Sequence, residues 1–460
     1  MDRYVLIALA SLVGVIFLIL FALVGDIVFG ALAWFYTAIF IPKYVFIVSI
    51  PGAPDIYIER LVFVLLLPVV LYLLATGKER TLPNTKLEFW MIVQLSLLII
   101  SMFRTGFLAT PGGGFQPFHV FLTGFFVPFC FYYFGKTFIN TEERLRIFLW
   151  GCFPLFAYLV FTAYMEHFKI NSLIFPKFIT NPFLGIHYGR ARGPFLVAPV
   201  NGWMMGSLFF ATLLLRTETR SLLGKMLIYP VLFATPVAIF FTYTRAVWLS
   251  FLVAPLFVSV YSKRLLFPKR FLFLPLVFLI VLVWANWQNI KSKERAKGGV
   301  MQVEEVEVRF RLFKVSTLMI KDKPLFGVGF ARFMEALPRY APEVHPAGKE
   351  AMASQHNIFL AMLTEVGILG TLPFLMILYY LLKYSVLAYR FLGEEGLISR
   401  ELIACFWGIM LVYIINALFI QTQYYIAPNS YVFLWAGIVT GVYQRITYPE
   451  AVFNEVYSYA

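Results

Sequence analysis

Residues 61–75 read LVFVLLLPVVLYLLA, a run with no charged residue and no alternation between polar and apolar positions. A strand of a membrane β-barrel would show that alternation. Apolar runs of about twenty residues recur throughout the 460-residue chain, and a helix of that length crosses a hydrocarbon layer about 30 Å thick. The sequence therefore predicts an all-α, polytopic membrane protein.

The composition supports this class and argues against a nucleic-acid partner. The chain is 61% hydrophobic and 13% charged, whereas about a quarter of the residues in a soluble domain are charged. Its net charge of +14 comes from short segments between apolar runs, which is typical of membrane topology rather than of a phosphate-binding stripe. Cys130, Cys152 and Cys405 lie in apolar segments without metal-ligand spacing, so we expect them to be small buried side chains.

The apolar runs also give the expected membrane spans. These lie near residues 4–24, 27–48, 60–75, 88–103, 118–135, 147–165, 196–215, 226–243, 246–262, 271–288, 357–382, 401–420 and 430–443. If the runs on either side of Asp26 form one bent element or a pair of half-spans, the total is about twelve transmembrane helices. Both chain ends then lie in the cytoplasm.

The segments between the spans differ in charge and length. Linkers rich in lysine and arginine are assigned to the cytoplasm, and these are residues 77–86, 135–146, 216–225, 263–270 and 383–400. Two longer segments, 166–195 and 289–356, then face outward. Residues 310–320 have a helical pattern that ends at Pro324 and the turn Gly327-Val-Gly329, so we expect segment 289–356 to be a large folded extracytoplasmic loop between late spans.

This organisation divides the chain into four parts. They are residues 1–288 with transmembrane helices and the outer loop 166–195, the periplasmic or extracytoplasmic loop 289–356, the C-terminal transmembrane helices 357–443 and a cytoplasmic tail 444–460. The sequence shows no internal repeat, whereas many transporters are built from two inverted halves.

His356 lies where the large loop enters an apolar span. Histidine has an unperturbed pKa near neutrality, so it can accept or donate a proton under ordinary conditions. A lone interfacial histidine bound to a loop carbonyl is the alternative, but Asn357 and Glu365 accompany this one. Glu365 lies about two and a half turns further along the helix, where a carboxylate is costly. We expect it to partner a polar group of a neighbouring helix rather than to act directly in catalysis.

Several arginines are predicted at the same membrane face. Arg245 lies between two apolar runs, Arg190 and Arg192 precede a span, and Arg309 and Arg311 open the loop helix. Any one of them could extend to lipid headgroups. Together they indicate an anionic ligand such as a pyrophosphate, because guanidinium groups match phosphate geometry and remain charged.

No motif indicates a bound cofactor. The chain has no glycine-rich phosphate loop with a lysine, no paired-histidine metal spacing and no Gly-x-Ser-x-Gly elbow. We therefore expect no cofactor and no metal, and the substrate itself must be an activated donor.

The motif His356-Asn-Ile-Phe-Leu, with Glu365-Val-Gly367 and Gly370, resembles the signature of the O-antigen ligase and O-antigen polymerase superfamily. Asp322-Lys-Pro-Leu-Phe-Gly-Val-Gly329 is similar to a turn of that family. Thr244-Arg245-Ala246 and Arg190-Ala-Arg-Gly193-Pro-Phe, with Asn201 after it, are similar to its arginine elements. The motifs cover about residues 185–380, and the layout of spans extends the resemblance to the whole chain.

The resemblance implies a multi-pass glycosyltransferase of the bacterial inner (cytoplasmic) membrane with its active site on the periplasmic face. It would move a glycan from undecaprenyl pyrophosphate to an acceptor hydroxyl. His356 would be the general base, supported by Asn357 and Glu365. Arg190 or Arg192, together with Arg245 and one of the two loop-helix arginines, would hold the pyrophosphate.

The acceptor is left open. A ligase of lipopolysaccharide biosynthesis transfers glycan to lipid A-core, whereas a polymerase joins lipid-linked repeat units into O-antigen or exopolysaccharide. A protein O-oligosaccharyltransferase is disfavoured because the chain ends soon after its last span. A polysaccharide transporter predicts an ionisable path through the middle of the membrane, whereas the polar groups here gather at one face.

Overall fold

The computed structural model describes residues 25–41, 56–108, 116–265, 284, 287, 303–341 and 355–448, which are helical and contain no β-strand. The helices are α2 (Val28–Phe40), α3 (Ile58–Ala75), α4 (Lys86–Thr105), α5 (Pro117–Phe121), α6 (Val127–Phe138), α7 (Glu142–His167), α8 (Ala198–Glu218), α9 (Leu222–Phe240), α10 (Arg245–Tyr261), α13 (Val303–Asp322), α14 (Phe333–Tyr340), α15 (Ile358–Phe391), α16 (Arg400–Ala417) and α17 (Ile426–Thr447). A π-helical segment, η1 (Leu122–Phe126), joins α5 to α6, and a 3₁₀ turn, η9 (Thr422–Tyr424), precedes α17.

The predicted class, an all-α membrane protein, is confirmed. Eight helical stretches of the described chain are long and apolar enough to cross a membrane, and α2 and α10 are shorter apolar helices. The predicted span 4–24, and all of 271–288 except residues 284 and 287, lie outside the described residues, so the expected total of about twelve stays a prediction.

The large predicted loop contains two helices in its described part. The helix that the pattern at 310–320 predicts spans Val303–Asp322, so it begins about two turns before Arg309 rather than at the arginines. The row of buried apolar side chains along this helix extends further toward the N-terminus than expected. Val308 still packs against the cluster of Leu312, Val315 and Met319. The helix ends before Pro324, as predicted.

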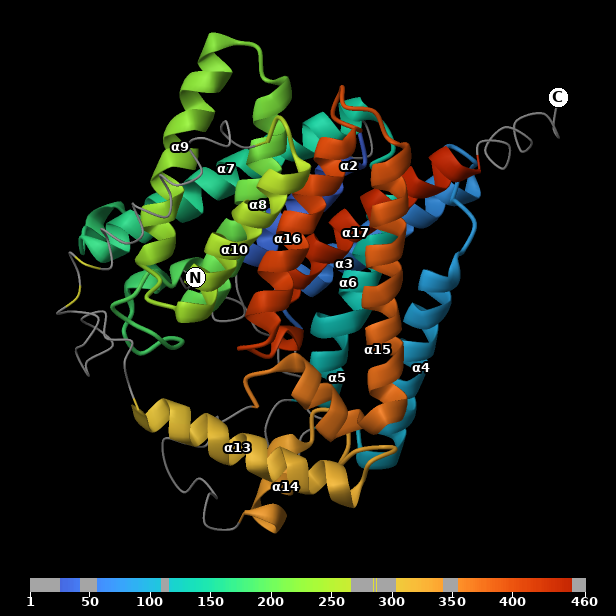
Figure 1. Cartoon of the computed structure of the whole chain (residues 1–460), viewed down its shortest axis with the longest axis vertical. Helices are drawn as coiled ribbons and strands as arrows, with labels where there is room; N and C mark the ends of the chain where they lie inside the picture. Colours follow the sequence, from blue (N-terminus) through green and yellow to red (C-terminus); the bar gives the residue numbers. More distant parts are fainter. Residues whose placement is uncertain are drawn as a thin grey trace, which may run out of the picture.

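The bundle has two distinct ends (Figure 1). At one end, here called the cap end, α13 and α14 lie across the bundle beside the end of α4 and the beginning of α15. The order of the helices brings the start of α10, the end of α16 and the start of α17 to this same end. The short links 76–85, 139–141, 219–221 and 392–399 lie at the opposite end.

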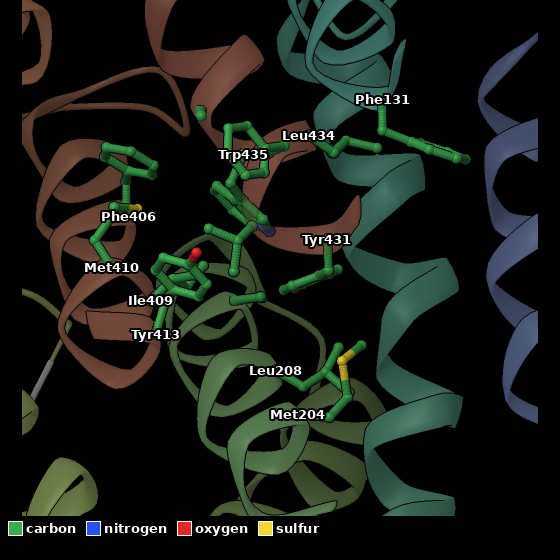
Figure 2. Close-up of a cluster of buried hydrophobic side chains, with 14 of the residues drawn as sticks. Phe131, Met204, Leu208, Phe406, Ile409, Met410, Tyr413, Tyr431, Leu434 and Trp435 are labelled. Carbon is green, nitrogen blue, oxygen red and sulfur yellow. The ribbon is translucent and has the colours of Figure 1, made fainter. Parts of the chain in front are cut away.

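Small residues permit the closest helix contact, between α6 and α17. A Cβ atom at Gly437 would overlap the Tyr132 carbonyl group, and one at Gly135 would overlap that of Leu434. Helices in a membrane approach closely where such residues face each other. Large side chains fill the neighbouring space, and Figure 2 shows Met204, Leu208, Phe406, Met410, Tyr431 and Trp435 gathered between α8, α16 and α17.

A buried ion pair fixes α4 against α6 near the opposite end. Lys136 Nζ lies 2.5 Å from Glu88 Oε1, and the same oxygen accepts a hydrogen bond from the Tyr132 hydroxyl. Glu88 also closes a capping box with Thr85 at the start of α4. Removing one partner of such a pair would leave an uncompensated buried charge.

Candidate active site

α15 is broken at Gly367. This residue has φ +65° and ψ −166°, a conformation that is nearly restricted to glycine, although the helical hydrogen-bond pattern continues on both sides. The break is not at Pro373, which also lies within α15. A break in a helix leaves carbonyl and amide groups without partners inside that helix.

The turn 324–329 supplies those partners through four backbone hydrogen bonds. The amides of Val328 and Gly329 donate to the carbonyls of Thr364 and Glu365 at 3.0 and 2.8 Å. The amides of Ile368 and Leu369 donate to the carbonyls of Pro324 and Leu325 at 2.9 and 3.2 Å. The two motifs recognised in the sequence are therefore two halves of one interlocked structure.

Glu365 joins the same structure through its side chain. The carboxylate is 1% exposed, and its Oε2 accepts a hydrogen bond from the Ala331 amide at 2.9 Å. Ala331 has a positive φ of 55°, and Phe330 beside it donates its amide to Ser101 Oγ on α4. Glu365 thus holds the segment after the turn, and its partner is a backbone amide outside the helices rather than a polar group of a neighbouring helix.

His356 occupies the connection just before α15. Asn357 is the N-cap of this helix and its Oδ1 accepts from the Leu360 amide at 3.0 Å, so its role is to start the helix. His356 itself is partly exposed and has a positive φ of 54°. For residues other than glycine this conformation is strained and is common at functional sites.

Arg245 lies near enough to Arg309 for their positive charges to interact. Although both residues are accessible to solvent, local desolvation and then the positive charge of Arg245 lower the pKa of Arg309 from its usual value. Within the described chain neither guanidinium forms an ion pair with a carboxylate. Two neighbouring guanidinium groups without a carboxylate partner are chemically suited to hold an anion.

Arg190 holds the short segment 241–244, which leads to Arg245. Its guanidinium is buried, donates from Nε to the Thr242 carbonyl at 2.8 Å and also contacts Thr244 Oγ1. The amide of Ala191 donates to the Phe241 carbonyl at 3.0 Å. These contacts fix the position at which α10 begins, and therefore the position of Arg245.

Comparison with known proteins adds the family. Residues 229–375 match the family model described as O-antigen ligase. This segment is therefore similar to O-antigen ligases. The match contains Arg245, α13, the turn 324–329, His356 and Glu365, so it confirms the resemblance to the O-antigen ligase and polymerase superfamily. No curated protein matches the chain.

Two further arginines were predicted to hold the pyrophosphate, Arg192 and Arg311. Arg192, which precedes the matched O-antigen ligase segment, is 1% exposed and donates to the carbonyls of Ile179, Asn181 and Leu184 at 2.6–2.8 Å. Arg311 lies two residues after Arg309, about 200° around α13. The pyrophosphate roles expected of Arg192 and Arg311 stay predictions.

The link 418–425 also contacts the part of the chain that matches the family model, and sequence reasoning missed it. Gln421 donates from Nε2 to Gln355 Oε1 at 2.6 Å, next to His356. The η1 segment contacts the same link, because Thr123 Oγ1 donates to the Gln423 carbonyl at 2.9 Å. Gln421 and Gln423 belong to no recognisable sequence motif, so only the fold shows that this link contacts the segment before His356.

The described residues contain no group of three His, Cys, Asp or Glu side chains arranged to hold a metal ion. The candidate site therefore consists of His356, the guanidinium pair of Arg245 and Arg309, and the polar groups around them.

Proposed function

We propose that the protein is a glycosyltransferase of the O-antigen ligase type. It transfers a glycan from an undecaprenyl-pyrophosphate donor to an acceptor hydroxyl, on the periplasmic face of the bacterial inner membrane. The observation that carries the proposal is the pair of Arg245 and Arg309, which has no carboxylate partner in the described structure and lies at the same end of the bundle as His356.

In this mechanism His356 accepts the proton of the acceptor hydroxyl, while the hydroxyl oxygen forms a bond to the anomeric carbon of the donor sugar. The bond between that carbon and the pyrophosphate oxygen breaks, and the electron pair leaves with undecaprenyl pyrophosphate. Arg245 and Arg309 stabilise the negative charge that develops on the leaving group. Arg190 is a positioning residue for Arg245.

The test compares two histidines in the same backbone conformation. Asparagine tolerates a positive φ, so His356→Asn removes the imidazole with little backbone strain. We expect it to lower glycan transfer by about 100-fold or more at unchanged protein abundance, as for loss of a general base. His187, with φ 63°, is the matched control, and His187→Asn should retain transfer. Full turnover by His356→Asn would refute the assignment.

The acceptor is identified by a gel of surface glycans from a strain that lacks the gene. We expect the strain to keep polymer on its lipid carrier and to lose long chains from lipid A-core, as for a ligase. Accumulation of single repeat units on the carrier would instead identify a polymerase of O-antigen or exopolysaccharide.

A further inference from the structure

The link 418–425 between α16 and α17 places two glutamine side chains inside the protein. Gln421 and Gln423 are 2% and 1% exposed. Neither the Nε2 nor the Oε1 of Gln423 has a hydrogen-bond partner among the described residues, and the same holds for Oε1 of Gln421. Buried amide groups are rarely left unpaired, because water no longer compensates for the missing hydrogen bonds.

The backbone around these side chains is firmly held. The Gln423 carbonyl accepts from Thr123, and the Thr422 carbonyl accepts from Asn429 Nδ2 at 2.6 Å. A Cβ atom at Gly124 in η1 would lie 2.7 Å from the Cβ of Gln423, so the π-helical segment packs directly against it. These two backbone carbonyls of the link therefore have hydrogen-bond partners, whereas the side-chain amide atoms named above do not.

One of the two glutamines is linked to the segment that carries the candidate base. Gln421 is bonded to Gln355, the residue immediately before His356. Tyr424, from the same link, lies close enough to Glu365 for the two to interact electrostatically. The glutamines are uncharged and belong to a different segment from Arg245 and Arg309, so they suit a different part of a substrate from the one that arginines bind.

We propose that Gln421 and Gln423 bind hydroxyl groups of a saccharide next to His356. A glutamine amide both donates and accepts hydrogen bonds, and so does a sugar hydroxyl. Gln355 is a positioning residue that orients Gln421. The proposal rests on the proposed glycan transfer and adds the residues that recognise the sugar rather than the pyrophosphate.

The experiment uses the full-length protein in lipid nanodiscs and two probes. One is a phosphate-free oligosaccharide repeat unit released from the surface glycan of the source bacterium, and the other is farnesyl pyrophosphate, which carries no sugar. Gln423→Met keeps the length of the side chain and removes its polar atoms. We expect its affinity for the oligosaccharide to fall about 5- to 100-fold, as for loss of hydrogen bonds to a buried ligand. Its affinity for farnesyl pyrophosphate should change less than about twofold.

Gln94 provides the matched control. It is a fully buried glutamine of α4 whose Nε2 and Oε1 also lack described partners. Gln94→Met should leave binding of both probes unchanged, and neither methionine variant should lower the thermal midpoint, because each removes unpaired polar atoms. Unchanged oligosaccharide binding by Gln423→Met, or no binding by the unaltered chain, would overturn the proposal and leave the amides satisfied by buried water alone.

Transfer assays then identify which sugar is bound. A higher KM for the acceptor in Gln423→Met assigns the site to the acceptor, and a higher KM for the donor assigns it to the donor glycan. The proposed function fails separately, if His356→Asn retains turnover or Arg245→Ala retains farnesyl pyrophosphate binding.

Discussion

Replacing Gly367 by alanine tests whether the break in α15 and the turn 324–329 form one unit. A Cβ atom at this position would overlap the Leu325 carbonyl group and lie 2.7 Å from the Phe326 nitrogen. The positive φ alone costs a residue with a side chain about 1–3 kcal/mol. Moving the turn away would also break the bonds from Ile368 and Leu369, at about 0.5–1.5 kcal/mol each. The expected loss is therefore about 2–6 kcal/mol of unfolding free energy.

The assay is denaturant unfolding of the purified full-length protein in mixed micelles, together with limited proteolysis of segment 303–341. Gly393→Ala is the control, because no atom lies within 4 Å of a Cβ built there and its φ is ordinary. The control should stay within about 0.5 kcal/mol of the unaltered chain. If Gly367→Ala matches the control in stability and in proteolysis, the interlocked arrangement does not constrain the glycine and the reasoning is wrong.

Three further substitutions distinguish residues that hold the candidate site in place from residues that bind the substrate or take part in the reaction. Glu365→Gln keeps an acceptor for the Ala331 amide, so the rate of glycan transfer should fall less than about tenfold. Loss of all turnover in a kinetic assay would instead assign the carboxylate a chemical role. Arg192→Gln removes hydrogen bonds to several loop carbonyls and should lower the thermal midpoint without changing the affinity of the remaining folded protein for farnesyl pyrophosphate. Arg245→Lys keeps the charge but not the planar fork, and it should weaken that affinity about tenfold by calorimetry, whereas unchanged affinity would indicate a residue that only contacts headgroups.

Much of the fold was predictable because lipid permits few solutions. A backbone in hydrocarbon must satisfy its own hydrogen bonds, so apolar runs of sufficient length become helices. The start of α13 was harder to predict, because few apolar residues surround Val308 and the sequence there is largely polar. Periodicity also gave no sign of the break at Gly367, since the turn that stabilises it comes from about forty residues earlier in the chain.

The candidate site was likewise predictable only in part. His356 and Arg245 were recognisable because charged or titratable side chains are rare beside long apolar runs. The sequence could not separate Arg190, Arg192 and Arg245, because all three lie at helix boundaries. Their surroundings distinguish them. Arg190 and Arg192 donate to backbone carbonyls inside the protein, whereas Arg245 is accessible and interacts electrostatically with Arg309.

The interlocked turn also explains how the proposed base and the proposed anion site, which lie on distant segments, can keep a fixed separation. α13 carries Arg309 and leads directly into the turn 324–329, and the turn is bonded to α15 on both sides of Gly367. The first part of α15, which follows His356, is therefore held at its start by the Asn357 cap and at its end by the turn. Because rigid positioning of the reacting groups contributes much of the rate of a bimolecular transfer, a change of the turn should lower transfer even where it leaves every polar side chain in place.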